Sequence, residues 1–130
     1  MRKLLFKLIY IFSLRFFIQR KSKNRLYILM FHQINNNNRT FYQAIPSVVF
    51  EKICWFVNKY FCVINISEIA EHFKNTNKPA VIISFDDGHY DIIQNALPAL
   101  KKYNLKFNVN IDTEILETKK PQDFVRVYDI

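Results

Sequence analysis

Three short, largely apolar runs constrain the fold of this chain more than any other feature of its sequence. They cover residues 26–31, 61–66 and 80–85. Such runs are typical of strands that are buried on both faces, as in a parallel sheet. Between the first two, Ser47 offers a helix N-cap, and apolar residues follow at helical spacing to Tyr60. Strand, helix and strand in this order predict an α/β fold in which parallel strands alternate with helices.

The rest of the chain continues this alternation. Ser67 could cap a brief helix to residue 73. From Asp91 onward the spacing is again helical, and Pro98 either kinks this helix or stands in its first turn. Asn104 suits the left-handed conformation at the helix end. Residues 106–111 then alternate as a strand does. One face would carry Phe107, Val109 and Ile111, and the other Asn108 and Asn110.

The net charge of +8 is confined to the N-terminal segment. Residues 1–25 contain eight basic residues and no acidic one, whereas 11 basic and 11 acidic residues balance from residue 26 onward. Because the body of the chain is neutral, a basic face for nucleic acid has little support. We therefore expect no nucleic-acid partner.

Residues 1–25 are also rich in apolar side chains, and we treat them as a segment separate from the domain. Their longest uncharged run, residues 8–14, is far shorter than the ~20 residues that span a bilayer. No small-residue cleavage site follows, which argues against a cleavable signal peptide. We expect a helix at the membrane interface, with Lys and Arg near anionic lipid. An uncleaved signal-anchor and an extra helix packed on the fold stay open. We expect a location that is cytoplasmic or peripheral to the cytoplasmic membrane.

Residues 26–130 are long enough for one domain with a single core. The two cysteines, Cys54 and Cys62, form no Cys-x-x-Cys pair. Cys54 lies in a helical pattern and Cys62 in an apolar run, which favours two buried, reduced thiols. A disulfide between them stays open.

Asp86 and Asp87 directly follow the apolar run 80–85, where a parallel sheet gathers its functional residues. Two adjacent carboxylates repel each other, and successive strand residues face opposite ways. A pocket with both therefore needs a sharp turn, which Gly88, the only glycine of the chain, can supply. On spacing alone, an ordinary loop after a buried strand is the simpler alternative.

A longer pattern surrounds this pair. Its segments are residues 28–32 (Ile-Leu-Met-Phe-His), 50–70, 81–88 (Val-Ile-Ile-Ser-Phe-Asp-Asp-Gly), 95–103 and 106–111. In this order they resemble the polysaccharide deacetylases, carbohydrate esterases that share the NodB homology domain. The resemblance covers residues 26 to about 117, with its core at residues 79–117.

The resemblance implies a distorted (β/α) barrel, of which this chain would form part, and a metal-dependent hydrolase that removes N- or O-acetyl groups from a polysaccharide or oligosaccharide. Asp86 would be the general base and Asp87 a ligand of a divalent metal, zinc by resemblance. His32 and His89 could face the substrate groove. A hydrogen-bonded histidine at a strand end is the alternative for His32.

The same family completes its metal site with a later His-x-x-x-His motif, which this chain lacks. Its only histidines are His32, His72 and His89, and the sequence after residue 116 no longer resembles the family. We therefore expect the N-terminal portion of a deacetylase domain, truncated, split or frameshifted, with an incomplete ligand set. The alternative is a catalytically inactive remnant or a membrane-surface binding module.

Overall fold

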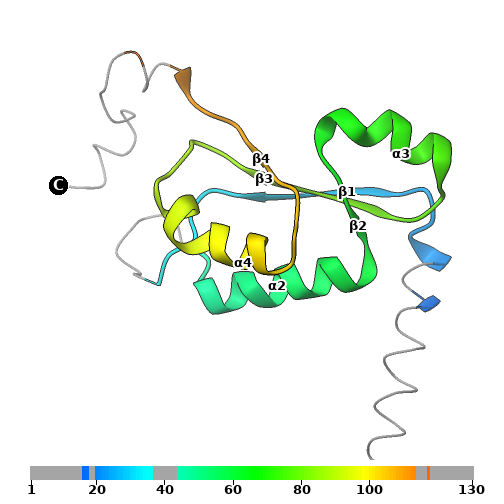
Figure 1. Ribbon diagram of the computed structural model, residues 1–130, viewed down its shortest axis with the longest axis horizontal. Helices are drawn as coiled ribbons and strands as arrows, with labels where there is room; N and C mark the ends of the chain where they lie inside the picture. Colours follow the sequence, from blue (N-terminus) through cyan, green and yellow to red (C-terminus); the bar gives the residue numbers. More distant parts are fainter. Residues whose placement is uncertain (1–15, 18–19, 37–43, 114–116, 118–130) are drawn as a thin grey trace, which may run out of the picture.

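The fold is built on a small parallel sheet with helices on both of its faces (Figure 1). The computed structural model describes residues 16–17, 20–36, 44–113 and 117. Its strands are β1 (Leu26–Phe31), β2 (Cys62–Val63), β3 (Ala80–Phe85) and β4 (Asn108–Val109). Every pairing between these strands is parallel, which confirms the predicted α/β class.

β3 is the central strand of the sheet. β1 pairs with it along its whole length, from Leu26 opposite Ala80 to Phe31 opposite Phe85. β2 pairs with the first two residues of β3, and β4 pairs with the last two. Because β1 fills one edge of β3, β2 and β4 share the other edge. All six residues of β3 are buried, as the continuous apolar run predicts.

Helices cover the two faces of the sheet unequally. α2 (Ser47–Tyr60), the π-helical turn η2 (Ile92–Ala96) and α4 (Leu97–Lys102) pack on one face. The 3₁₀ turn η1 (Ile66–Glu68) and α3 (Ile69–Asn75) pack on the other face, near the start of β3. Figure 1 shows α2 and α4 below the sheet and α3 above it.

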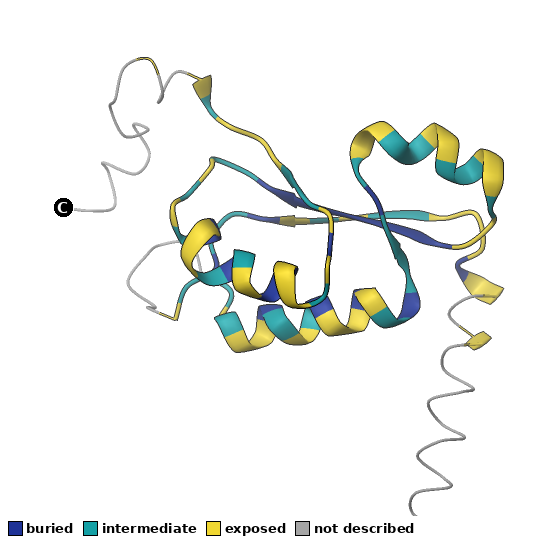
Figure 2. Cartoon of the chain, in the orientation of Figure 1, coloured by how far each residue is buried: buried dark blue, intermediate teal, exposed yellow. Residues whose placement is uncertain are grey.

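Three aromatic rings form the centre of the larger core. The ring centroid of Phe50 on α2 lies 5.2 Å from that of Phe31 and 5.8 Å from that of Phe85. Phe50 and Phe85 are fully buried, and Figure 2 shows the dark blue of buried residues along β3. The rings meet at tilted or edge-to-face angles, the arrangement that aromatic quadrupoles favour. This contact fixes α2 against the ends of β1 and β3.

One face of β1 is uncovered in the described part of the chain. Tyr27 and Leu29 pack against the larger core, whereas Ile28 and Met30 are 63% and 61% exposed. Figure 2 shows this alternation as teal and yellow along β1. Paired residues of a parallel sheet point to the same side, so Met30 shares its face with Ser84.

The strand predicted over residues 61–66 is shorter than expected and ends at Val63. The N–H of Asn65 does not extend the ladder but donates to the carboxylate of Glu68 at 2.8 Å, which closes the turn of η1. The cap predicted at Ser67 is therefore wrong, because this residue lies inside that turn. The strand predicted over residues 106–111 is likewise limited to β4.

Helix α2 begins at Ser47, which had been predicted as its N-cap. The N-cap is Pro46 instead. The N–H of Ser47 donates to Oδ1 of Asn36 at 3.1 Å. A side chain from the preceding loop thus satisfies one of the unpaired N–H groups of the first turn. The predicted helix is confirmed, and its predicted cap is wrong.

Pro98 lies in the first turn of α4, one of its two predicted places. A proline has no N–H to donate, and its ring clashes with the carbonyl four residues earlier in a regular α-helix. The wider π-helical turn of η2 immediately before it accommodates both effects. Asn104 has a φ of 50°, which confirms the predicted left-handed helix end.

Cys54 and Cys62 are both free, so they do not form the disulfide that the sequence left open. Cys54 is fully buried in the larger core, and this burial raises the pKa of its thiol to about 12. A thiol with such a pKa stays protonated and unreactive at neutral pH. Cys62 is half-buried.

Most of the N-terminal segment lies outside the described residues, and with it the predicted interfacial helix. Within the described part, Arg20 lies over the ring of Phe16 and Lys21 over the ring of Phe17. No described helix has both the length and the apolar character needed to cross a bilayer.

We expect Phe50→Ala to lower the free energy of unfolding by about 3–5 kcal/mol, because it leaves a cavity between α2 and the sheet. Urea denaturation followed by circular dichroism measures the change. Val49→Ala on the same helix is the control: Val49 is 45% exposed, so its truncation should cost less than about 1 kcal/mol. Equal losses in the two variants would show that the aromatic centre is not where the stability lies.

Candidate active site

The predicted site residues gather at the carboxyl edge of the sheet. His32 directly follows β1, and Asp86 and Asp87 directly follow β3. The ladder extends past the strand ends here, because the N–H of Asp86 donates to the carbonyl of Phe31 at 2.9 Å. On the opposite edge, the N–H of Asn110 donates to the carbonyl of Phe85 at 2.8 Å. Asp86 therefore lies between the end of β1 and the end of β4.

The carboxylate of Asp86 has a side-chain partner. Its Oδ1 accepts a hydrogen bond from Nδ2 of Asn110 at 2.8 Å. The same Nδ2 lies 3.3 Å from Oγ of Ser84, whose side chain is buried. Asn110 shares a strand face with Asn108 in the predicted alternation, but it is not among the predicted site residues. The sequence feature that could have indicated Asn110 is the pair of asparagines that faces away from the apolar side chains of this strand.

The chain turns sharply at Asp87 and Gly88, which have φ angles of 66° and 63°. The turn predicted at Gly88 is confirmed, but it begins one residue earlier than expected. A left-handed conformation costs most residues with a side chain roughly 1–2 kcal/mol, although aspartate tolerates it better than most. Such strain clusters at functional sites, where the surrounding structure maintains it.

The turn brings Asp87 close to His89. Oδ2 of Asp87 lies 3.7 Å from Nε2 of His89, and both side chains are partly exposed. Asp86 bonds to Asn110 while Asp87 lies near His89, so the two neighbouring carboxylates have different partners. His72 lies on α3, where its Nε2 is 2.9 Å from the carbonyl of Lys78, and it takes no part in this site.

The donor atoms of Asp87 and His89 suit a divalent metal ion such as zinc. Carboxylate oxygen and imidazole nitrogen are both zinc ligands, at about 2.0–2.2 Å from the ion. Two ligands of one ion can lie 3.7 Å apart at these bond lengths, so the pair fits as part of a metal site. No three His, Cys, Asp or Glu side chains within the described ranges are grouped closely enough to hold a metal.

A second set of contacts fixes the loop that follows β1. Oδ2 of Asp91 accepts a hydrogen bond from the N–H of Ile34 at 2.9 Å, and Nδ2 of Asn95 donates to the carbonyl of the same residue at 2.7 Å. Burial raises the pKa of Asp91 above its ordinary value of 3.8, although the bond from Ile34 opposes this effect. These contacts hold the segment after His32 against the helix that follows the Asp-Asp-Gly turn.

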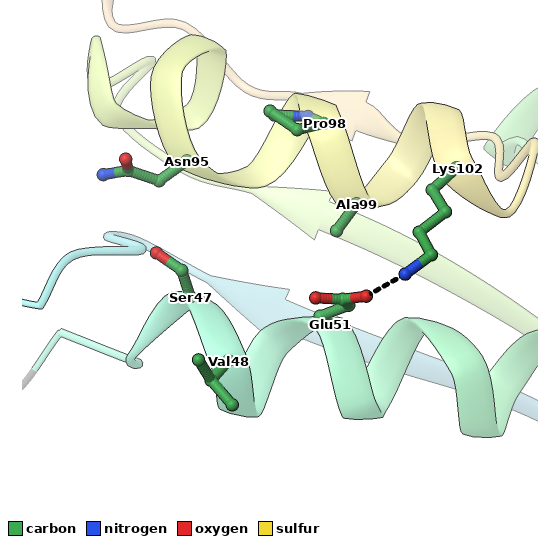
Figure 3. A pocket seen from close by; sticks show the side chains of 7 residues that line it. All are labelled: Ser47, Val48, Glu51, Asn95, Pro98, Ala99 and Lys102. Atoms are coloured by element: carbon green, nitrogen blue, oxygen red, sulfur yellow. Dashed lines mark hydrogen bonds and ion pairs between the residues drawn. The ribbon is translucent and has the colours of Figure 1, made fainter.

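A shallow recess of about 290 Å³ lies elsewhere, between α2 and α4 (Figure 3). Glu51 and Lys102 form an ion pair across it, and this pairing lowers the pKa of Glu51 and raises that of Lys102. Both side chains are exposed, so the pair contributes little to stability. The recess is lined by Ser47, Val48, Glu51, Asn95, Pro98, Ala99 and Lys102. None of the predicted site residues lines it.

Known proteins are similar to this chain in sequence and in fold. No protein-family model matches the chain. YxkH of Bacillus subtilis strain 168, which is named as a polysaccharide deacetylase, is 31% identical over 96 residues, covering 71% of this chain and 33% of YxkH. The deacetylase PplD of Streptococcus pyogenes, solved in complex with acetate, has a TM-score of 0.64 at 23% identity, covering 75% of this chain and 46% of PplD. IcaB from Ammonifex degensii has a TM-score of 0.56 at 21% identity, covering 68% and 39%.

The parallel sheet with helices on both faces places the chain among α/β proteins. More particularly, the chain belongs to the polysaccharide deacetylase family, as its sequence predicted. It spans about a third of the length of YxkH and less than half of each of these two solved chains. The predicted partial fold of this type is confirmed. The roles of Asp86, Asp87, His32 and His89 stay predictions.

We expect Gly88→Ala to lower the free energy of unfolding by about 1–2 kcal/mol through backbone strain. A Cβ at this position would lie 3.6 Å from Ile111, an ordinary contact, so steric clash adds little. Gly88→Asn should cost less, because asparagine tolerates positive φ. Urea denaturation compares the two variants. Equal stability of wild type and Gly88→Ala would contradict the strain assigned to this turn.

Proposed function

We propose that this chain supplies the Asp-Asp part of a metal-dependent deacetylase site that hydrolyses acetyl groups on a glycan. The observation that carries the proposal is the placement of two adjacent carboxylates, with separate partners, at the carboxyl edge of the sheet in a relative of the polysaccharide deacetylases. Because the chain spans only part of these relatives, ligands from further polypeptide would complete the site.

In this proposal Asp86 is the general base. Its Oδ1 accepts the amide of Asn110, which leaves Oδ2 to take a proton from the water that attacks the acetyl carbonyl. A carboxylate that stands at a strand end, beside a buried hydroxyl and a backbone ladder, can accept this proton without leaving its position. General-base catalysis of this kind contributes about 10²–10⁴-fold to a rate.

Asp87 and His89 would hold the divalent cation. When bound, such a cation supplies Lewis acidity toward the acetyl carbonyl and toward the attacking water. The turn at Asp87 and Gly88 directs the Asp87 carboxylate toward His89 and away from the strand, so that the base and the ligand do not compete for one position. Catalytic zinc takes three protein ligands, so this pair needs a further ligand, which a histidine of the family's His-x-x-x-His motif would supply.

The reaction adds one water across the bond to the acetyl group. It releases acetate and leaves an amine where the glycan carried an N-acetyl group, or an alcohol where it carried an O-acetyl group. PplD, which shares the fold, was solved in complex with acetate. We infer an acetylated polysaccharide or oligosaccharide as the substrate class. His32, at the neighbouring strand end, would face the same groove.

A non-catalytic role is the second candidate. The absence of a third metal ligand near Asp87 and His89 within the described residues favours it over an enzyme complete in itself. A remnant of a deacetylase, or a module that binds a membrane surface through residues 1–25, would keep the Asp-Asp-Gly turn without using it.

Zinc titration by isothermal calorimetry tests the metal site. We expect micromolar binding by the wild-type chain and a loss of roughly 100-fold or more in Asp87→Ala, because a direct ligand is removed. Glu71→Ala is the matched control, since it removes an exposed carboxylate on α3. Absence of zinc binding by the wild type would favour the non-catalytic role.

The zinc-loaded chain also allows a direct assay of acetate release from an N-acetylated chitooligosaccharide. If the chain is active, Asp86→Asn should lower kcat by about 10²–10⁴-fold, because the amide cannot accept the proton. Zinc binding without acetate release would leave the metal site intact and would limit the catalytic proposal to a chain joined by further polypeptide.

A further inference from the structure

We propose that Asn110 is a positioning residue that holds the carboxylate of Asp86 in one orientation. The proposal rests on the role of Asp86 as the base in the proposed function. Its evidence is the 2.8 Å hydrogen bond from Nδ2 of Asn110 to Oδ1 of Asp86. A carboxylate accepts hydrogen bonds only, so the nitrogen of the amide and not its oxygen must face it.

The amide of Asn110 is itself anchored by the core. Its Nδ2 carries two hydrogens, which can be shared between Asp86 and Oγ of Ser84, 3.3 Å away. Ser84 is 5% exposed and belongs to the central strand, so the backbone that carries this second partner is held by the core. The backbone of Asn110 is fixed as well, because its N–H donates to the carbonyl of Phe85 at 2.8 Å. Asn110 is exposed, so these contacts with Phe85 and Ser84 are what tie its amide, and through it Asp86, to the end of β4 and to β3.

A neutral amide suits this role. It donates to one carboxylate oxygen and brings no charge and no proton of its own that the base could take at neutral pH. A free aspartate samples several rotamers, and holding one of them in advance removes that entropy cost from the reaction. The bond to Oδ1 leaves Oδ2 as the oxygen that would take the proton in the proposed function.

Asn108 is the same residue type two positions before Asn110, and it has different contacts. It lies in β4. Its Nδ2 lies 3.5 Å from the carbonyl of Ile83, and no contact with a carboxylate is seen among the described residues. Asn108 is therefore a matched control, because its truncation removes an equal side chain from β4 and leaves the donor to Asp86 in place.

NMR of the isotopically labelled chain tests the proposal directly. The three-bond couplings from the backbone nitrogen and carbonyl carbon of Asp86 to its Cγ report the side-chain rotamer. We expect a single rotamer in the wild type and in Asn108→Ala, and averaged couplings in Asn110→Ala. Asn110→Asp, which keeps the shape but lacks both donors, should also lose the wild-type rotamer and serves if Asn110→Ala does not fold.

Averaged couplings in the wild type, or an unchanged single rotamer in both Asn110 variants, would overturn the proposal. Zinc titration separates positioning from a general structural role: Asn110→Ala should keep the wild-type zinc affinity, because Asp87 and His89 are untouched. A parallel loss of zinc affinity would mean that Asn110 supports the whole turn and does not act on Asp86 alone. If the wild type binds no zinc, the metal proposal fails, and the rotamer comparison still decides the role of Asn110.

Discussion

The burial of β3 is the constraint on which the rest of the structure depends. This strand has neighbours on both edges, and all six of its residues are buried. It can turn only after Phe85, which packs against Phe50 and Phe31. The first residues free to carry charge are therefore Asp86 and Asp87. The packing that stabilises the fold therefore also determines that the two carboxylates lie at the carboxyl end of β3.

Local strain and distant contacts then divide the two carboxylates between different surroundings. Asp86 continues the direction of its strand and reaches Asn110, whereas Asp87 adopts a left-handed conformation and reaches His89. Adjacent residues of a regular strand would achieve this separation by pointing to opposite faces of the sheet. Here the turn keeps both at one edge. The hydrogen bond from the N–H of Ile34 to Asp91 holds the neighbouring loop, which follows β1, in place.

Much of this arrangement could be predicted from the sequence, because apolar runs report burial and burial determines which segments become strands. The strands 26–31 and 80–85 and the turn at Gly88 follow from such local patterns. The partners of side chains across the fold could not be predicted in the same way. Asn36 satisfies the start of α2 from eleven residues away, and Asn110 meets Asp86 only because β4 pairs with β3. Residue type shows that a donor exists, but register decides where it points.

The uncovered face of β1 has a consequence for the chemistry of the site. Met30 lies on the same side of the sheet as Ser84, whose hydroxyl contacts the amide that holds Asp86. Any polypeptide that covered Ile28 and Met30 would therefore also border the carboxylates and displace bulk water from them. Charges interact more strongly as the surrounding dielectric falls. Hydration of this one face thus links the covering of β1 to the strength of the electrostatic interactions that Asp86 and Asp87 can make.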